Sequence, residues 1–100
     1  MSHSVDEILS GMIELLRECG LDSKADWFLH RRDVLRDSLT ESAQFSDAVR
    51  ELDAATAGMG GFTDIPLTPR SDRITVQDAR DKQWELAEGL GDAIEKLTSQ

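Results

Sequence analysis

The sequence predicts an all-α fold: one compact bundle of about four helices, with a long glycine-rich apolar loop before the last helix. Apolar residues recur at helical spacing in four segments, and capping or helix-ending residues bound these segments. The connections between the first three segments are only a few residues long, which is typical of helices that pack side by side. Neither a repeat nor a change in composition divides the 100 residues, so we expect a single helical domain over residues 1–100.

The first helix is expected at residues 5–19. Ser4 is a suitable N-cap, and Glu7 completes a capping box three residues later. Gly20 followed by Leu21 is typical of a helix C-cap with its trailing hydrophobic contact. One face of this helix is apolar throughout, and it carries Val5, Ile8, Leu9, Met12, Ile13, Leu15, Leu16 and Cys19. Because Cys19 lies on this face, we expect a buried and unreactive thiol.

The second helix is expected from about Ser23 to Leu39. Its inward face is expected to hold Ala25, Phe28, Leu29, Leu35 and Leu39. Trp27 and Val34 lie seven residues apart and form a second apolar patch, about 120° away from the first. A small basic cluster on the same helix is expected to pair with nearby acidic residues at helical spacing, and it consists of Arg31, Arg32 and Arg36.

The third helix is expected at residues 41–57, capped by Thr40 and ended by Gly58. Its inward face is expected to hold Phe45, Ala48, Val49, Leu52 and Ala55. The last helix is expected from Thr75, whose capping-box partner is Asp78, to about Thr98. Its packed side is expected to hold Val76, Ala79, Leu86, Leu90, Ala93, Ile94 and Leu97. The direction of this helix relative to the third is left open.

The segment between these two helices combines flexibility with apolar side chains. Three glycines in the four positions 58–61 exclude a regular helix there. The segment is also rich in apolar residues, namely Met59, Phe62, Ile65 and Leu67. It lacks the preceding strand and the lysine of a phosphate-binding loop. We therefore expect Met59, Phe62 and Ile65 to plug the bundle, with a partner-binding loop as the alternative.

The loop also carries a family resemblance, in the residues Gly58-Met59-Gly60-Gly61-Phe62-Thr63-Asp64. Together with Leu15-Leu16-Arg17 and Ala25-Asp26-Trp27, this loop resembles a family of small bacterial all-helical proteins of unknown function. Gly61 stands where that family usually has serine, and Thr63 where it usually has asparagine. The resemblance implies an all-helical fold and brings no established activity.

Charge narrows the classes of partner. The formal net charge is −9, which argues against binding to nucleic acid or to an anionic membrane surface. Acidity is compatible with a basic protein partner, although it also serves solubility alone. The single cysteine excludes an internal disulfide, and neither a signal peptide nor a run of about 18 apolar residues is evident. We therefore expect a cytoplasmic protein.

The sequence predicts no catalytic, cofactor or metal site. Asp26, His30, Asp33 and Asp37 form a line along the second helix that could ligate a metal, but this line points away from the apolar face. One histidine among exposed carboxylates does not make a shielded site, so we interpret the line as a solvated face. No spacing brings a nucleophile, a base and an orienting group together.

The function expected from the sequence is a non-enzymatic protein-binding module, of an immunity-like or otherwise inhibitory kind. Its candidate partner-binding residues are Trp27, Asp33, Val34, Asp37, Met59, Phe62, Asp64, Trp84, Glu85 and Glu88. Both tryptophans lie off the main apolar stripes, and a second core layer is the alternative for them, with Trp84 filling space beside Gly91. Two further functions remain open: a structural homo-oligomer joined through Trp27 and Val34, and a small-ligand binder or enzyme with residues 58–67 as a lid.

Overall fold

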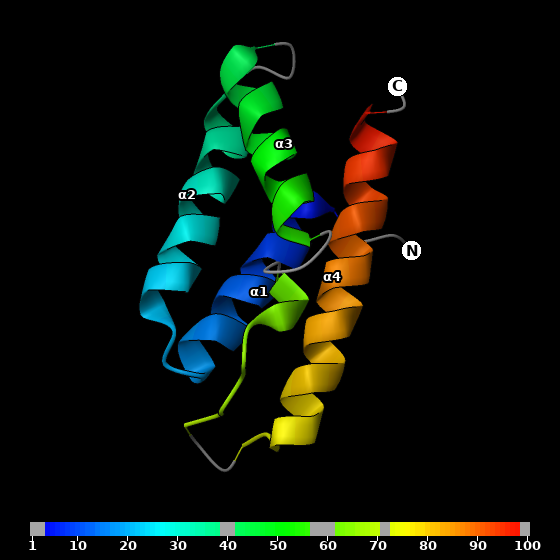
Figure 1. The fold of residues 1–100 in the computed structure, drawn as a ribbon. Coiled ribbons are helices and arrows are strands. Elements are labelled where there is room, and N and C mark those ends of the chain that lie inside the picture. The colour runs from blue at the N-terminus through cyan, green and yellow to red at the C-terminus, as the bar shows by residue number, and fades with distance from the viewer. Residues whose placement is uncertain (1–3, 39–41, 57–61, 71–72, 99–100) are drawn as a thin grey trace.

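The computed structural model describes residues 4–38, 42–56, 62–70 and 73–98. In these ranges the chain forms α1 (Val5–Glu18), α2 (Asp22–Asp37), α3 (Ala43–Thr56), the short 3-10 helix η1 (Phe62–Asp64) and α4 (Val76–Thr98), with no strand. The helices contact one another in the cyclic order α1, α2, α3, α4 (Figure 1). Helices α3 and α4 run in opposite directions, which settles the direction that the sequence leaves open. The all-α bundle predicted from the sequence is confirmed.

Helix α1 begins and ends where its capping residues predict. The Ser4 hydroxyl accepts a hydrogen bond from the backbone N–H of Glu7 at 3.2 Å. At the other end Gly20 has φ of +75°, a conformation that suits glycine, and the N–H of Leu21 donates to the carbonyl of Leu16 at 2.8 Å. This last bond is the one that defines a Schellman motif.

Helices α2 and α3 differ at their ends from the sequence prediction. Helix α2 starts at Asp22, so Ser23 lies inside the helix, and the N-cap residue Leu21 provides no side-chain bond. At the start of α3, the Ser42 hydroxyl accepts from the N–H of Phe45 at 3.2 Å. The predicted cap Thr40 and the predicted last residue of α2, Leu39, lie outside the described residues.

Helix α4 has the predicted cap in full. The Thr75 hydroxyl accepts from the N–H of Asp78 at 3.0 Å, and the Asp78 carboxylate accepts from the N–H of Thr75 at 3.3 Å. The predicted packed side is correct except at its first position, because Val76 is exposed. Val76 lies in the first turn of α4, at the end that extends past α1 and α3 in Figure 1. The side chain of Leu97 lies outside the described residues.

The core runs along the axis of the bundle. Its largest fully buried side chains come from α1, α3, η1 and α4, and they are Leu9, Met12, Leu16, Leu52, Phe62 and Leu90. The predicted inward faces of α1 and α3 are buried or half-buried, and Cys19 is half-buried. Burial raises the pKa of the Cys19 thiol, with a further contribution from the charge of Glu18, which fits the expected lack of reactivity.

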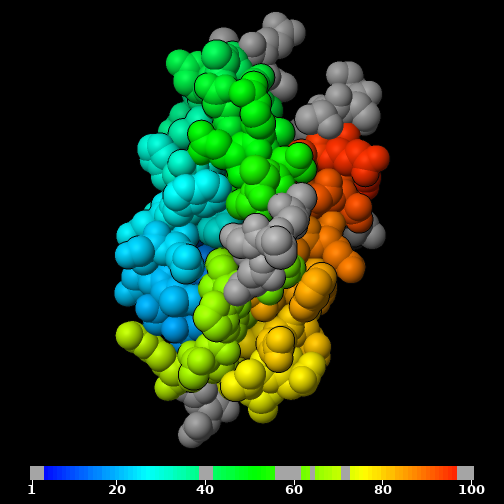
Figure 2. Space-filling model, in the orientation of Figure 1, coloured from blue at the N-terminus to red at the C-terminus, as the bar shows by residue number. Residues whose placement is uncertain are grey.

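The described part of the long connection docks on the core. Phe62 is 1% exposed, and its ring meets that of Phe28 edge-on, with ring centroids 5.7 Å apart. Leu67 is buried, and the N–H of Arg70 donates to the Glu18 carbonyl at 3.0 Å. Figure 2 shows this segment filling the space between α2 and α4 on one face of the molecule. The predicted plug is therefore correct for Phe62, whereas Ile65 is half-buried and Met59 lies outside the described residues.

One glutamine fixes this segment to α4. Among the described residues Gln83 is the one buried polar side chain, at 2% exposure. Its side-chain amide donates to the carbonyls of Phe62 at 2.7 Å and Ile65 at 2.8 Å. It therefore satisfies two backbone acceptors of the connection that would otherwise face an apolar interior.

Helices α1 and α4 pack through a reciprocal pair of glycines. A Cβ atom on Gly11 would lie 3.1 Å from Cδ2 of Leu86, and a Cβ atom on Gly89 would lie 3.4 Å from Cδ1 of Ile8. Each helix thus receives a large side chain from the other at the position where it has none. This arrangement lets the two helix backbones approach closely.

The basic cluster of α2 pairs across helices. Arg31 reaches Glu51 of α3 at 2.8 Å, and Arg36 makes a two-point pair with Asp6 of α1, with Nη2 and Oδ2 2.8 Å apart. The prediction of pairing at helical spacing is therefore wrong for these two arginines. The acids of other helices approach these guanidinium groups because α2 packs between α1 and α3.

Candidate functional site

The exposed side of α4 carries the most prominent apolar residue of the described surface. Trp84 is 56% exposed, and it lies near the middle of a 23-residue helix. Exposed charged residues lie around it within about 100° on the helix surface, and they are Arg80, Asp81, Glu85 and Glu88. We call Trp84 and these four residues the α4 face. Lys82 is exposed as well, but its spacing places it about 160° away from Trp84. Asp81 and Glu88 lie three and four residues from Trp84, so they share its side of the helix.

Trp84 does not fill the space beside Gly91, which corrects the structural interpretation of this tryptophan. A Cβ atom on Gly91 would meet nothing within 4 Å. Indole rings are large and apolar, and tryptophan is enriched where proteins contact partners. The packing of α4 against the other helices therefore does not explain why an exposed tryptophan lies among charged residues on this helix.

Trp27 lies in a different environment and belongs to the packing of α2 on its neighbours. Its ring meets that of Phe28 edge-on at 4.9 Å, and the Arg31 guanidinium carbon lies 4.0 Å from the ring centroid. Arg31 also joins Glu51 of α3, so the cation–π contact lies within an interhelical connection. Trp27 is half-buried as a result. The two tryptophans, which look alike in the sequence, thus differ in role.

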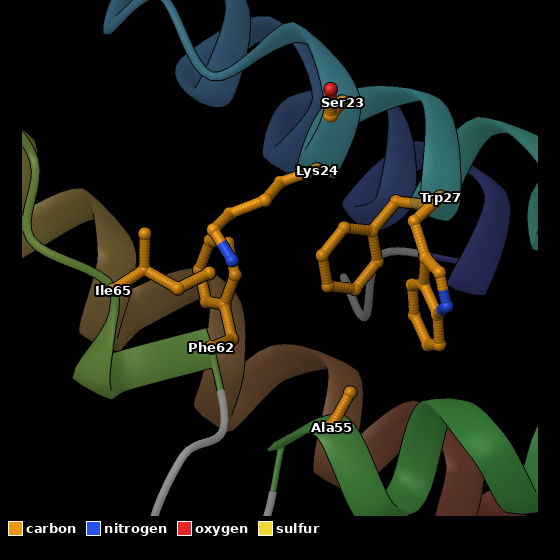
Figure 3. A pocket seen from close by; sticks show the side chains of 7 residues that line it. Ser23, Lys24, Trp27, Ala55, Phe62 and Ile65 are labelled. Carbon is orange, nitrogen blue, oxygen red and sulfur yellow. The ribbon is translucent and has the colours of Figure 1, made fainter.

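A pocket of about 350 Å³ opens beside Trp27, between α2, the end of α3 and η1. Its walls are mainly aromatic and aliphatic, and they include Trp27, Phe28, Ala55, Phe62 and Ile65 (Figure 3). Lys24 extends along one wall toward Phe62, and Ser23 lies at the edge. We call this the α2–η1 pocket. It provides one ammonium group and one hydroxyl, without a histidine or a carboxylate among the residues that line it.

The candidate partner-binding residues do not form one surface. Asp33, Val34 and Asp37 lie on α2 with Trp27, whereas Trp84, Glu85 and Glu88 lie on α4. Figure 1 shows these helices on opposite sides of the bundle, and no pair of their described Cα atoms lies within 8 Å. Phe62 is buried, so it is unavailable to a partner. Met59 and the side chain of Asp64 lie outside the described residues.

The line of potential metal ligands on α2 is exposed along its length, as its spacing predicts. The side chains of Asp26, His30, Asp33 and Asp37 all face solvent. Asp26 accepts a hydrogen bond from Arg17 of α1 at 3.1 Å. The described residues contain no group of three or more histidine, cysteine or acidic side chains placed to hold a metal ion.

Comparison with protein-family models, with curated proteins and with solved structures finds no match. Within the described residues, every helix is either too short or too polar to cross a membrane.

Proposed function

We propose that this protein is a non-enzymatic binding module that docks a basic protein on its α4 face. The exposure of Trp84 in the middle of α4 carries the proposal. An indole ring can fill a pocket on a partner, and such an anchor at the centre of an interface contributes a large share of binding energy. The helix is held along its inner side by α1, α3 and η1, so the ring is presented by a rigid element.

The charges around Trp84 favour a basic partner. Asp81, Glu85 and Glu88 outnumber the one cation of the face, Arg80, and the whole chain has a net charge of −9. Complementary charge accelerates association and makes it depend on ionic strength. An immunity-like or inhibitory module would act in this way, by covering a basic surface of its target.

Affinity capture with salt elution tests this proposal. Wild-type protein and Trp84→Ala are immobilised in parallel, exposed to lysate at low salt and eluted with rising salt, and the eluted proteins are identified by mass spectrometry. We expect a stoichiometric basic protein whose affinity falls roughly thirtyfold in Trp84→Ala, since a hot-spot tryptophan contributes about 2 kcal/mol or more. Val76→Ala is the matched control, because Val76 is the other exposed large apolar residue among the described side chains of α4.

A charge variant distinguishes the contribution of Trp84 to affinity from the contribution of the acidic residues to the association rate. Glu85→Gln combined with Glu88→Gln is expected to slow association at low salt and to change dissociation little. Glu14→Gln, an exposed substitution on α1, is the control. An affinity that is unchanged in Trp84→Ala would contradict a docking role for the α4 face. An association rate that depends neither on salt nor on the double charge substitution would contradict it as well.

A small apolar ligand in the α2–η1 pocket is a second candidate function. Three aromatic rings around one cavity favour it, since small-molecule sites of about 300–1,000 Å³ are commonly lined in this way. The ring of Trp27 provides the assay, because a ligand seated beside it changes the indole fluorescence. Trp84→Phe removes the second indole signal, and an unchanged Trp27 emission across a panel of small aromatic acids would argue against this candidate.

Self-association through Trp27 and Val34 stays a prediction. Both side chains are half-buried, and Arg31 lies over the indole ring of Trp27. Sedimentation at high micromolar concentration tests it, and a purely monomeric protein would contradict it. Membership of the helical family that the loop sequence resembles also stays a prediction.

A further inference from the structure

A second pocket, of about 490 Å³, lies at the end of the bundle where α1 begins and α4 ends. All four helices contribute to it. Its apolar wall is formed by Leu9, Leu35, Phe45 and Ala93. Its size lies in the range of about 300–1,000 Å³ that is typical of small-molecule sites. None of its lining residues belongs to the α4 face or the α2–η1 pocket.

The charges of this pocket are opposite in sign to those of the protein. Arg32, Arg36 and Lys96 line it with a single carboxylate, that of Asp6. The chain has only 11 basic residues against 20 acidic ones, so three cations around one cavity are a marked local excess. Asp6 is bound to Arg36 through both oxygens, and this contact lowers the pKa of the Asp6 carboxyl. We call this cavity the cationic pocket.

Arg32 is the cation with an unused donor. Its side chain is 18% exposed, and its Nη1 donates to the Ser10 hydroxyl at 2.9 Å. Its Nε is buried and has no hydrogen-bond acceptor among the described residues. The carboxylate of Asp33 lies 3.8 Å from this nitrogen, which is close enough for an ion pair but too far for a hydrogen bond. Buried donors in native proteins nearly always have an acceptor, so an acceptor bound beside Arg32 would satisfy a donor that otherwise has none.

We propose that the cationic pocket binds a monocarboxylate with an aliphatic chain. The carboxylate would accept hydrogen bonds from Arg32, whose fork of donors suits two-point binding, with Lys96 contributing positive charge. The chain would lie against Val5, Leu35 and Phe45, which line the pocket and are half-buried. A single negative charge fits better than a phosphate dianion, because Asp6 is in the same pocket and repels a second charge.

Titration of the full chain with straight-chain carboxylates tests this proposal. Hexanoate, heptanoate and octanoate are added below their micellar concentrations, and binding is followed by calorimetry and by the NMR signal of the arginine Nε–H groups. We expect affinity to rise about fourfold for each methylene that the pocket buries. Octan-1-ol, which has the chain without the charge, and acetate, which has the charge without the chain, should bind at least tenfold more weakly.

Two variants with matched controls locate the site. Arg32→Gln should weaken octanoate binding by roughly ten- to hundredfold, because it removes charge-assisted hydrogen bonds. Arg50→Gln is its control, since the Arg50 side chain is 80% exposed on α3. Ala93→Leu should remove the chain-length dependence by filling the pocket, and Ala54→Leu on the exposed side of α3 should not. Circular dichroism confirms that each variant is folded.

The NMR signal distinguishes direct contact from an indirect effect. Octanoate should shift the Nε–H resonance that is missing in Arg32→Gln, and acetate should shift it only at much higher concentration. Absence of saturable octanoate binding would overturn the proposal. Equal binding of octanol, or octanoate binding that survives both Arg32→Gln and Ala93→Leu, would overturn it as well.

Discussion

Replacing Gln83 by methionine tests whether a single side chain holds the connection between α3 and α4. Methionine has nearly the same length and shape as glutamine, so packing in the core is largely kept. What is lost are the two hydrogen bonds to the carbonyls of Phe62 and Ile65, at 2.7 and 2.8 Å. The Phe62 carbonyl keeps a second bond, from the N–H of Ile65 at 3.2 Å.

The expected loss of stability follows from these contacts. A net hydrogen bond contributes about 0.5–1.5 kcal/mol, and a buried acceptor left without a donor costs about 1–3 kcal/mol. With one carbonyl still partly satisfied, we expect Gln83→Met to lower the free energy of unfolding by about 2–3 kcal/mol. For a domain of this size that corresponds to a fall in Tm of roughly 10–20 °C.

Urea unfolding followed by circular dichroism measures this loss, and amide hydrogen exchange locates it. The m-value should stay constant, and the exchange of amides in residues 62–70 should accelerate more than that of the α1 core. Gln77→Met is the control, because Gln77 is exposed on the same helix and bonds only Asp81 among the described contacts. A change below about 0.5 kcal/mol in Gln83→Met, or an equal loss in the control, would refute the reasoning.

Other perturbations have expected outcomes of their own. Gly91→Ala should stabilise the protein by about 0.5–1 kcal/mol in thermal unfolding, because nothing lies near its Cβ position and alanine favours the helix. Gly20→Ala should destabilise it by about 1–2 kcal/mol, because φ is +75° there. Asp6 has a lowered pKa beside Arg36, so its pairing stabilises the fold above the ordinary carboxyl pKa and is lost as pH falls through the lowered value. Asp6→Asn should therefore lower the urea midpoint at neutral pH, and the difference from wild type should vanish in acid. Cys19 should react with iodoacetamide more slowly than a free thiol and accelerate only at higher pH, because its pKa is raised.

The helices could be predicted because their signals are local. The caps at Ser4, Gly20 and Thr75 act within one turn of the chain, and the apolar stripes of α1 and α3 give their buried faces directly. The start of α2 is harder to predict from the sequence, because no side-chain cap marks it at Asp22.

The functional surfaces could be predicted only in part, because they depend on contacts between distant segments. Trp27 and Trp84 both lie off the main stripes, and the fold rather than helical spacing makes Trp27 half-buried and leaves Trp84 exposed. The role of Gln83 depends on a connection about 20 residues earlier in the sequence, so helical spacing gives no sign of it. The basic cluster of α2 was visible in the sequence, and its gathering with Lys96 required the fold.

The reciprocal glycines of α1 and α4 limit where this chain can change its length. Ile8 and Gly11 are three residues apart, and so are Leu86 and Gly89, so each large side chain meets the opposite glycine only if both intervals are kept. One residue inserted within either interval would rotate the rest of that helix by about 100° and advance it by about 1.5 Å, which would place a side chain where the two backbones meet. An insertion among the described non-helical residues that follow η1 would leave both intervals unchanged, because it lies outside α1 and α4. The contact between α1 and α4 therefore fixes the number of residues between each large side chain and its glycine. The connection before α4 is where homologous chains could differ in length.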